Sequence, residues 1–182
     1  MGRVIAIEEA RDGTQALQPL LDIVNEDMEA INRIILDKAV SDVDMIPQLA
    51  HHLIDSGGKR FRPLLHLMCA RLCGFTGELR FPLAASIEFI HTASLLHDDV
   101  IDEAVIRRGK TSANIAWGNA ASVLVGDFLY SRSFTLLSII GNLDIFRLMS
   151  KMTNTMSEGE VFQLMKCGDT NLTEAEYLNI VE

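Results

Sequence analysis

Apolar residues recur along this chain at intervals of three and four, which is the spacing of one face of an α-helix. Two successive groups show it clearly: Leu17, Leu20, Leu21 and Val24, then Met28, Ile31, Ile34 and Ile35. Runs in which β-branched and polar residues alternate, as in strands, are not found. Because 48% of the residues are hydrophobic, a large core can be buried. We predict an all-α fold, an antiparallel helical bundle.

Prolines, glycines and polar clusters divide the pattern into separate helices. We place Pro19 in the first turn of the first helix, where its missing N–H does no harm. Further helices are expected over residues 46–55, 63–72, 83–102, 119–140 and 143–165. Loops are expected over residues 56–63, 73–82 and 107–114.

The end of the chain carries a helix-start signature. Thr173, with Glu176 three residues later, resembles a capping box. The helix that it opens has no stop signal before Glu182. We therefore interpret residues 1–182 as the N-terminal part of a single domain, with a bundle that is incomplete at its C-terminus.

Three carboxylates, Asp98, Asp99 and Asp102, follow the apolar run FIHTASLL. On a helix Asp98 and Asp102 share a face, roughly 6 Å apart, and Asp99 can reach the same site. Converging carboxylates repel one another unless a cation offsets their charge. Oxygen ligands suit Mg²⁺, which often binds through one or two carboxylates and substrate phosphates. The alternative is a solvated helix end, but acids oppose the helix dipole there.

Two basic clusters flank these acids in the sequence. Lys59, Arg60 and Arg62 follow the Gly57–Gly58 pair at the expected start of a helix, where free amides and the helix dipole favour anions. Arg107 and Arg108 follow the acids; their simplest role is a solvated loop that offsets neighbouring charge. Arginine forks match phosphate geometry. Beside a Mg²⁺ site, the two clusters together suggest a diphosphate substrate.

Two histidines lie near the acids. His91 is two turns before Asp98 on the same helix face, although a lone histidine on an apolar helix is more often a core residue. His97 faces elsewhere, and we assign it no role.

Composition excludes several other classes of function. The net charge of −9 argues against nucleic-acid binding. No apolar run reaches the about 18 residues of a membrane span, so no transmembrane segment is expected. Three cysteines without framework spacing indicate free thiols, and no secretory signal is visible. Cys69 and Cys73 are read as an apolar helix face rather than a metal pair. We expect a cytoplasmic protein.

Four stretches together resemble the trans-type polyprenyl diphosphate synthases, of the long-chain, octaprenyl- or decaprenyl-like kind. They are, in order, GGKRFRP, EFIHTASLLHDDVIDEAVIRRGKTSAN, VLVGDFLYSRSF and EGEVFQL, and they span roughly residues 49–164. DDVID looks like the first aspartate-rich motif of that family. The resemblance implies an isoprenoid synthase fold and a prenyltransferase that condenses isopentenyl diphosphate with an allylic prenyl diphosphate.

The resemblance also implies roles for individual residues. Asp98, Asp99 and Asp102 would hold Mg²⁺ ions that bridge the allylic diphosphate, and Arg107 would contact that diphosphate. The isopentenyl diphosphate would be held by Lys59, Arg62, His91 and Arg108. The helix around VLVGDFLYSRSF resembles the region that forms the family's homodimer. Small residues at Ala93 and Ser94, where bulky ones would block chain growth, imply a long product of the kind used as a quinone side chain.

The second aspartate-rich motif of the family does not occur in these residues, so we expect this chain to be inactive alone. One alternative is a truncated or regulatory subunit that pairs with a full-length synthase. Another is a helical metal phosphohydrolase of the HD type, which would use a further histidine, the His97–Asp98 pair and a distant aspartate such as Asp127. That reading leaves GGKRFRP and the Arg107–Arg108 pair without a role, and the direction of His97 discriminates between the two enzymes.

Overall fold

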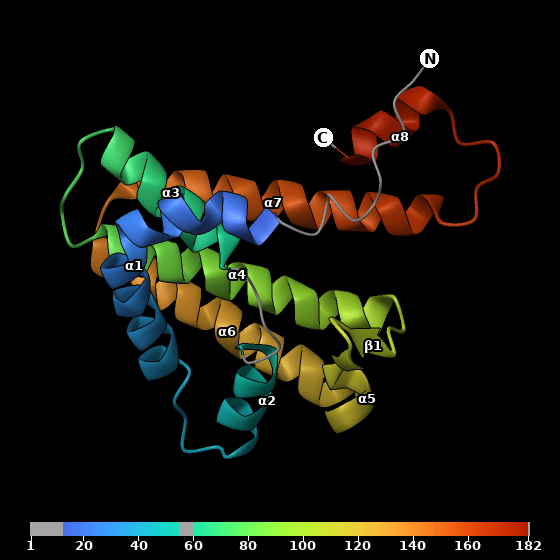
Figure 1. Ribbon diagram of the computed structural model, residues 1–182. Helices are drawn as coiled ribbons and strands as arrows, with labels where there is room; N and C mark the ends of the chain where they lie inside the picture. The colour runs from blue at the N-terminus through green and yellow to red at the C-terminus, as the bar shows by residue number, and fades with distance from the viewer. Residues whose placement is uncertain (1–12, 55–59, 182) are drawn as a thin grey trace. The chain divides into compact units, whose positions relative to one another are not determined.

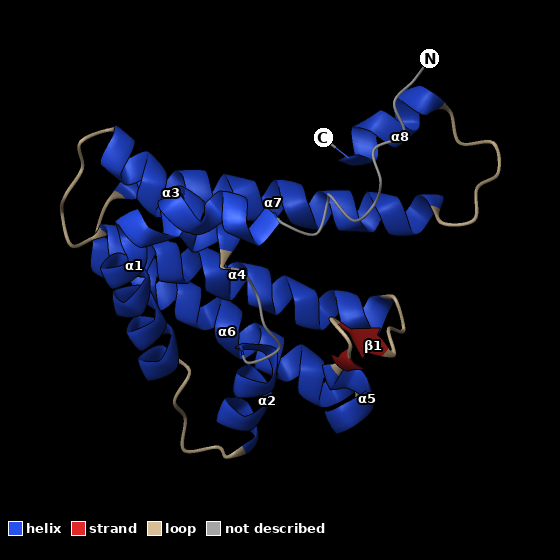
Figure 2. Ribbon diagram, viewed as in Figure 1, coloured by secondary structure: helices blue, strands red, loops and turns tan. Residues whose placement is uncertain are grey.

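The computed structural model describes residues 13–54 and 60–181, and almost all regular structure in them is helical, as predicted (Figures 1 and 2). The described residues form two compact units, which divide between Ile140 and Gly141. The first holds α1 (Gly13–Lys38), α2 (Met45–Ile54), α3 (Phe61–Leu72), α4 (Arg80–Ile101), β1 (Ile106–Arg107), β2 (Lys110–Thr111), α5 (Ala113–Trp117) and α6 (Asn119–Ile140). The second holds α7 (Leu143–Lys166) and α8 (Glu174–Val181). The prediction that they form part of one domain stays a prediction.

The central element of the first unit is α4. It packs most extensively against α6, which runs antiparallel to it, and also against α1 and α3 (Figure 1). Fully buried side chains of all four helices contribute to this core, among them Ile31 and Ile35, Leu67, Phe89 and Leu96, Leu129 and Leu136, and Leu49 of α2 is buried with them. Burial of these side chains, about 1.5–3 kcal/mol for each, holds the unit together.

One carboxylate ties three helices of this unit together. Asp27 on α1 accepts hydrogen bonds from Arg71 of α3, at 2.9 Å, and from Arg80 of α4, at 3.1 Å. Burial by itself would raise the pKa of Asp27, but the hydrogen bonds and charges of the two arginines outweigh it and lower the pKa. The charged form of Asp27 therefore stabilises the fold.

Most helix boundaries agree with the sequence prediction, and the differences involve proline. The helix α6 has the predicted bounds, while α3 and α4 begin two and three residues early, which places Pro63 and Pro82 inside their first turns. Proline is tolerated there because the first N–H groups of a helix have no partner within it. The placement of Pro19 in a first turn is wrong, because it lies inside α1.

The segment after α4 is more ordered than the predicted loop over residues 107–114. It forms the short antiparallel pair β1–β2, with Arg107 opposite Lys110, and the helix α5. Arg108 and Gly109 both have positive φ, 52° and 78°, as a two-residue type I′ hairpin turn requires. Ser112 anchors the hairpin, since its hydroxyl donates to the carbonyl of Ala104 at 2.5 Å. The alternation pattern missed this hairpin because two-residue strands are too short to show it.

Both helices of the second unit are capped at their N-termini. The Asn142 side chain accepts from the backbone N–H groups of Asp144 and Ile145 at the start of α7. The predicted capping box is confirmed: Thr173 N–H donates to Glu176 at 3.0 Å, and Glu176 N–H donates to the Thr173 hydroxyl at 3.3 Å. A hydrogen bond from Lys166, followed by those from Thr173, lowers the pKa of Glu176 to about 2.

By length and composition alone, α6 could cross a membrane, with a mean hydropathy of 1.4 over its most apolar stretch. The core helix of a water-soluble protein meets the same criteria, so the expectation that no transmembrane segment occurs stays a prediction. In the part of the chain that the structure describes, 39% of that stretch is buried. The packing of α6 against α4 is that of a core helix.

Replacing Asp27 by Asn should lower the free energy of unfolding by about 2 kcal/mol at pH 7, because two arginines lose a buried charged acceptor. The pKa of folded Asp27 lies below its usual value of 3.8. The difference from wild type should therefore be complete above that pH and shrink as the pH falls through the lowered pKa. Urea unfolding between pH 2.5 and 7 measures it.

The exposed Asp37, which pairs with Lys38 at 2.8 Å, is the control. Asp37→Asn should change stability by less than about 0.5 kcal/mol. Equal effects of the two variants would show that the Asp27 contacts do not stabilise the fold.

Candidate active site

The C-terminal half of α4 carries five of the predicted site residues, and Asp102 is its C-cap. The helix remains regular to its end, since Asp102 N–H donates to the carbonyl of Asp98 at 2.8 Å. Asp98 and Asp102 therefore lie one turn apart, Asp98 half-buried and Asp102 exposed at the helix cap. His91 lies two turns earlier and is half-buried. This face offers two carboxylates beyond a histidine, as the spacing predicted.

Asp99 occupies a different environment from the other two acids. Its side chain is 0% exposed, and its Oδ1 accepts from Arg107 Nε at 2.6 Å. Its Oδ2 is buried and has no hydrogen-bond partner. The Asp99 carbonyl also accepts from the N–H of Ala104 at 3.0 Å. Asp99 thus binds the hairpin back to the end of α4 through both its side chain and its backbone.

The chemistry of these donors fits a hard cation better than their arrangement does. All three offer carboxylate oxygens, and the unpartnered Oδ2 of Asp99 has spare capacity for a positive charge. Among the described residues, however, no group of three His, Cys, Asp or Glu side chains is placed to hold a metal ion. Asp98 and Asp102 fit best, because Asp99 is engaged by Arg107. The assignment of Asp99 as a ligand stays a prediction.

The charges of three arginines act on His91. Burial lowers the pKa of His91, and the positive charges of Arg62, Arg108 and Arg107 lower it further, against the opposing effect of Glu88. The imidazole is therefore neutral at pH 7, and residues distant in the sequence form one basic region. Arg62 and Arg108 are exposed, so their guanidinium groups are accessible to an anion. Lys59 and the Gly57–Gly58 pair lie outside the described residues.

Glu88, which lies on α4 one turn before His91, is not among the residues predicted from the sequence. Its Oε1 accepts from Arg60 Nη1 at 2.7 Å, and both side chains are largely buried. Arg60 precedes the first residue of α3 and has a left-handed backbone, with φ 47° and ψ 39°. The signal was present in the sequence, because an acid inside the apolar run of α4 needs a cationic partner.

His97 points toward α6. Its Nε2 lies 3.2 Å from the carbonyl of Val123 and 3.4 Å from Asp127 Oδ1. Gly126 leaves room for the ring, since a Cβ at that position would clash with it. The HD-type hydrolase requires His97, Asp98 and Asp127 to share one metal, and the described residues contain no such group. His97 instead joins two core helices.

The two residues linked to product length differ in their surroundings. Ala93 is 1% exposed and belongs to the hydrophobic core. Ser94 is half-buried, and its hydroxyl donates to the carbonyl of His91 at 2.9 Å. A larger side chain at position 94 therefore meets less resistance than one at position 93.

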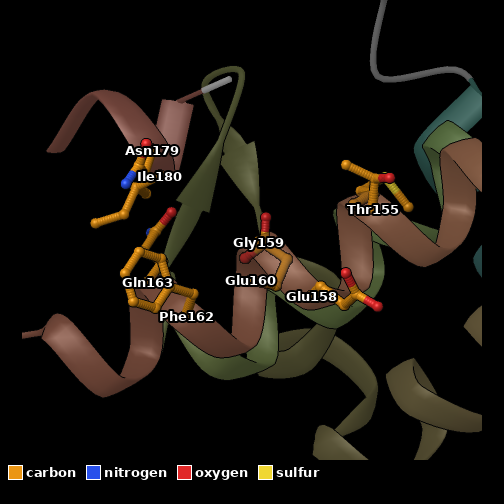
Figure 3. A pocket seen from close by; sticks show the side chains of 9 residues that line it. Thr155, Glu158, Gly159, Glu160, Phe162, Gln163, Asn179 and Ile180 are labelled. Atoms are coloured by element: carbon orange, nitrogen blue, oxygen red, sulfur yellow. The ribbon is translucent and has the colours of Figure 1, made fainter. Parts of the chain in front are cut away.

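A separate cavity of about 490 Å³ lies in the second unit, between α7 and α8. Figure 3 shows Phe162 and Gln163 of α7 beside Asn179 and Ile180 of α8. Residues of the EGEVFQL motif supply most of the lining, and none of the residues predicted to bind metal or diphosphate contributes to it. The EGEVFQL motif thus forms one wall of an open cavity.

Comparison with protein-family models matches residues 43–182 to the polyprenyl synthetase family. Octaprenyl diphosphate synthase of Escherichia coli (strain K12) is 46% identical over 165 residues, which cover 91% of this chain and 51% of that protein. The all-trans-nonaprenyl-diphosphate synthase (geranyl-diphosphate specific) of Rhodobacter capsulatus is 41% identical, with coverage of 90% and 51%. The chain thus spans about half the length of the curated relatives it matches.

Solved structures of polyprenyl and decaprenyl diphosphate synthases also match this chain. A polyprenyl synthase of Caulobacter crescentus, crystallised with calcium and isoprenyl diphosphate, superposes with a TM-score of 0.88 at 47% identity, covering 91% of this chain and 50% of that one. A decaprenyl diphosphate synthase of Rhodobacter capsulatus gives a TM-score of 0.86 at 43% identity, with coverage of 90% and 51%.

Replacing Arg107 by Gln should lower the free energy of unfolding by about 3 kcal/mol, because it leaves the buried Asp99 carboxylate unpaired. Arg108→Gln, which changes an exposed neighbour, should alter it by less than about 0.5 kcal/mol. Combining Arg107→Gln with Asp99→Asn should recover part of the loss, since no unpaired charge remains. Urea unfolding measures all of these variants, and a loss in the double variant equal to the sum of the two single losses would contradict the pairing.

Proposed function

Because the chain belongs to the polyprenyl synthetase family, we propose that the protein containing it condenses isopentenyl diphosphate with an allylic prenyl diphosphate. The product in this proposal is a long-chain trans-polyprenyl diphosphate. The observation that supports it most is the convergence at α4: Asp98 and Asp102 lie one turn apart, and the charges of three arginines act on His91. Carboxylates for a cation and arginines for a diphosphate thus occur together.

In this proposal Asp98 and Asp102, with Asp99 behind them, hold Mg²⁺. When bound, Mg²⁺ would neutralise the charge that develops on the departing diphosphate. Arg107 contacts the allylic diphosphate, and its fork is held in place by Asp99. A preorganised charge of this kind stabilises the leaving group without further rearrangement.

The isopentenyl diphosphate is assigned to Lys59, Arg62, His91 and Arg108. The neutral His91 can donate one hydrogen bond to a phosphate oxygen, while Arg62 and Arg108 supply the charge. The apolar side chains of α4 and α6 keep water from the carbocation that forms when the allylic C–O bond breaks.

The relatives are about twice as long as this chain, so we propose that further helices complete the site. The protein is proposed to be cytoplasmic and to form a homodimer through α6, where Val123, Leu124 and Ile139 are exposed apolar residues. The alternative, a non-catalytic subunit that pairs with a full-length synthase, rests on the half-length match alone.

The test of this function uses the protein at its full natural length. With Mg²⁺ and an allylic diphosphate, it should incorporate labelled isopentenyl diphosphate into a long prenyl product, and a chelator should abolish the incorporation. Asp98→Ala should reduce turnover by about 10³-fold or more, because the carboxylate that anchors the cation is lost. Near-normal turnover in a folded Asp98→Ala variant would remove Asp98 from the mechanism.

A second prediction concerns product length. A phenylalanine at position 94 should block the path of the growing chain one turn below Asp98 and shorten the product by several isoprene units. Adding Ala93→Phe should shorten it further, although position 93 lies in the core and overpacking there costs about 1–3 kcal/mol. Chromatography of the dephosphorylated products measures the length, and an unchanged product from active Ser94→Phe enzyme would place the length limit elsewhere.

A further inference from the structure

We propose that Glu88 and Arg60 are a positioning pair, which holds the first turn of α3 against α4 so that Arg62 faces His91. This inference rests on the proposed function and deepens it, since that function assigns neither residue to a substrate. The sequence placed Arg60 in an anion-binding cluster, but the structure pairs it with Glu88. Binding of the isopentenyl diphosphate then depends on an ion pair that does not contact this substrate.

The pair is geometrically well defined. Arg60 Nη1 and Glu88 Oε1 are 2.7 Å apart, and the two side chains are only 15% and 9% exposed. An ion pair with so little solvent is screened weakly and directs its partners strongly. The neighbouring Pro63 and Leu64 of α3 and Phe89 of α4 are buried, and α3 packs against α4, so the pair joins two helices that are also in apolar contact.

The backbone of Arg60 gives the pair its second function. A non-glycine residue with φ 47° occupies an unfavourable region, which the surrounding structure must impose. Its carbonyl accepts from Leu64 N–H at 3.0 Å and so begins α3. The guanidinium of Arg60 cannot cap the helix, because it has no acceptor, and it donates to Glu88. Loss of Glu88 would release this conformation at the point where α3 starts.

Both members of the pair lie next to the residues proposed to bind diphosphate. Arg60 is two residues before Arg62, and Glu88 is one helical turn before His91. The charges of Arg62 and Glu88 both act on the His91 imidazole, so the three side chains share one electrostatic environment. A shift at the start of α3 therefore changes the distance between two groups that must hold the same ligand.

The chain contains a matched control for a purely structural role. Asp27 is also buried, also pairs with arginines at 2.9 and 3.1 Å, and also joins α3 and α4. It contacts Arg71 and Arg80, near the far end of α3 and the start of α4. Asp27→Asn thus removes a comparable ion pair away from the site.

The experiment compares Glu88→Gln, Arg60→Gln, Arg60→Lys and Asp27→Asn in the protein at its full natural length. Glu88→Gln and Arg60→Gln should raise the KM for isopentenyl diphosphate about tenfold, the effect of one charge-assisted hydrogen bond. The KM for the allylic diphosphate and kcat should change by less than threefold. Arg60→Lys, which keeps the charge, should stay near wild type, and Asp27→Asn should lower only Tm.

The double variant Glu88→Gln with Arg60→Gln should raise the KM no more than either single change. Equal changes in both KM values, or an effect of Asp27→Asn as large as that of Glu88→Gln, would overturn the inference. Calorimetry with inorganic pyrophosphate separates it from the proposed function. If wild type shows no condensation but binds pyrophosphate more tightly than Glu88→Gln does, the proposed function is wrong and the positioning role of the pair is supported. If Glu88→Gln binds pyrophosphate as tightly as wild type does, the positioning role of the pair is wrong.

Discussion

The buried charge of Asp99 organises this region of the molecule. A carboxylate with no solvent exposure at the end of a central helix must have a cationic partner, and Arg107 of β1 supplies it at 2.6 Å. That requirement turns the chain back immediately after α4, through a hairpin whose turn places Arg108 in a left-handed conformation. The same turn brings both arginines close enough for their charges to act on His91.

Buried ion pairs recur at the other junctions of α4. Asp27 joins α1 to α3 and to the start of α4, and Glu88 joins α4 to the start of α3. Apolar burial holds these helices together, but it is not directional and tolerates small shifts. Ion pairs with little solvent fix one register between helices, which a site made of side chains from three elements requires. The fold thus combines an apolar core with a few directional contacts beside the functional residues.

Membership of the polyprenyl synthetase family gives these contacts a chemical meaning. A diphosphate needs positive charge at fixed positions, and here a carboxylate holds one of the arginines proposed to bind it directly and another through a neighbouring arginine. Arg107 is itself paired with Asp99, and Arg62 follows Arg60, the partner of Glu88. The acids of α4 therefore serve two purposes in this proposal: some face the cation, while Asp99 holds Arg107 and Glu88 holds Arg60, which positions Arg62.

The sequence by itself determined the helical class, most helix boundaries, the Thr173–Glu176 capping box and the spacing of Asp98 and Asp102, because all of these depend on local periodicity and local hydrogen bonds. It did not determine the β1–β2 hairpin, the burial of Asp99, or the roles of Glu88 and His97. Those depend on partners elsewhere in the chain: Arg107, Arg60 and the close approach of α6 at Gly126. A charge in an apolar run shows that a partner must exist, but only packing decides which residue it is. For that reason three aspartates that look equivalent in the sequence occupy three different environments in the fold.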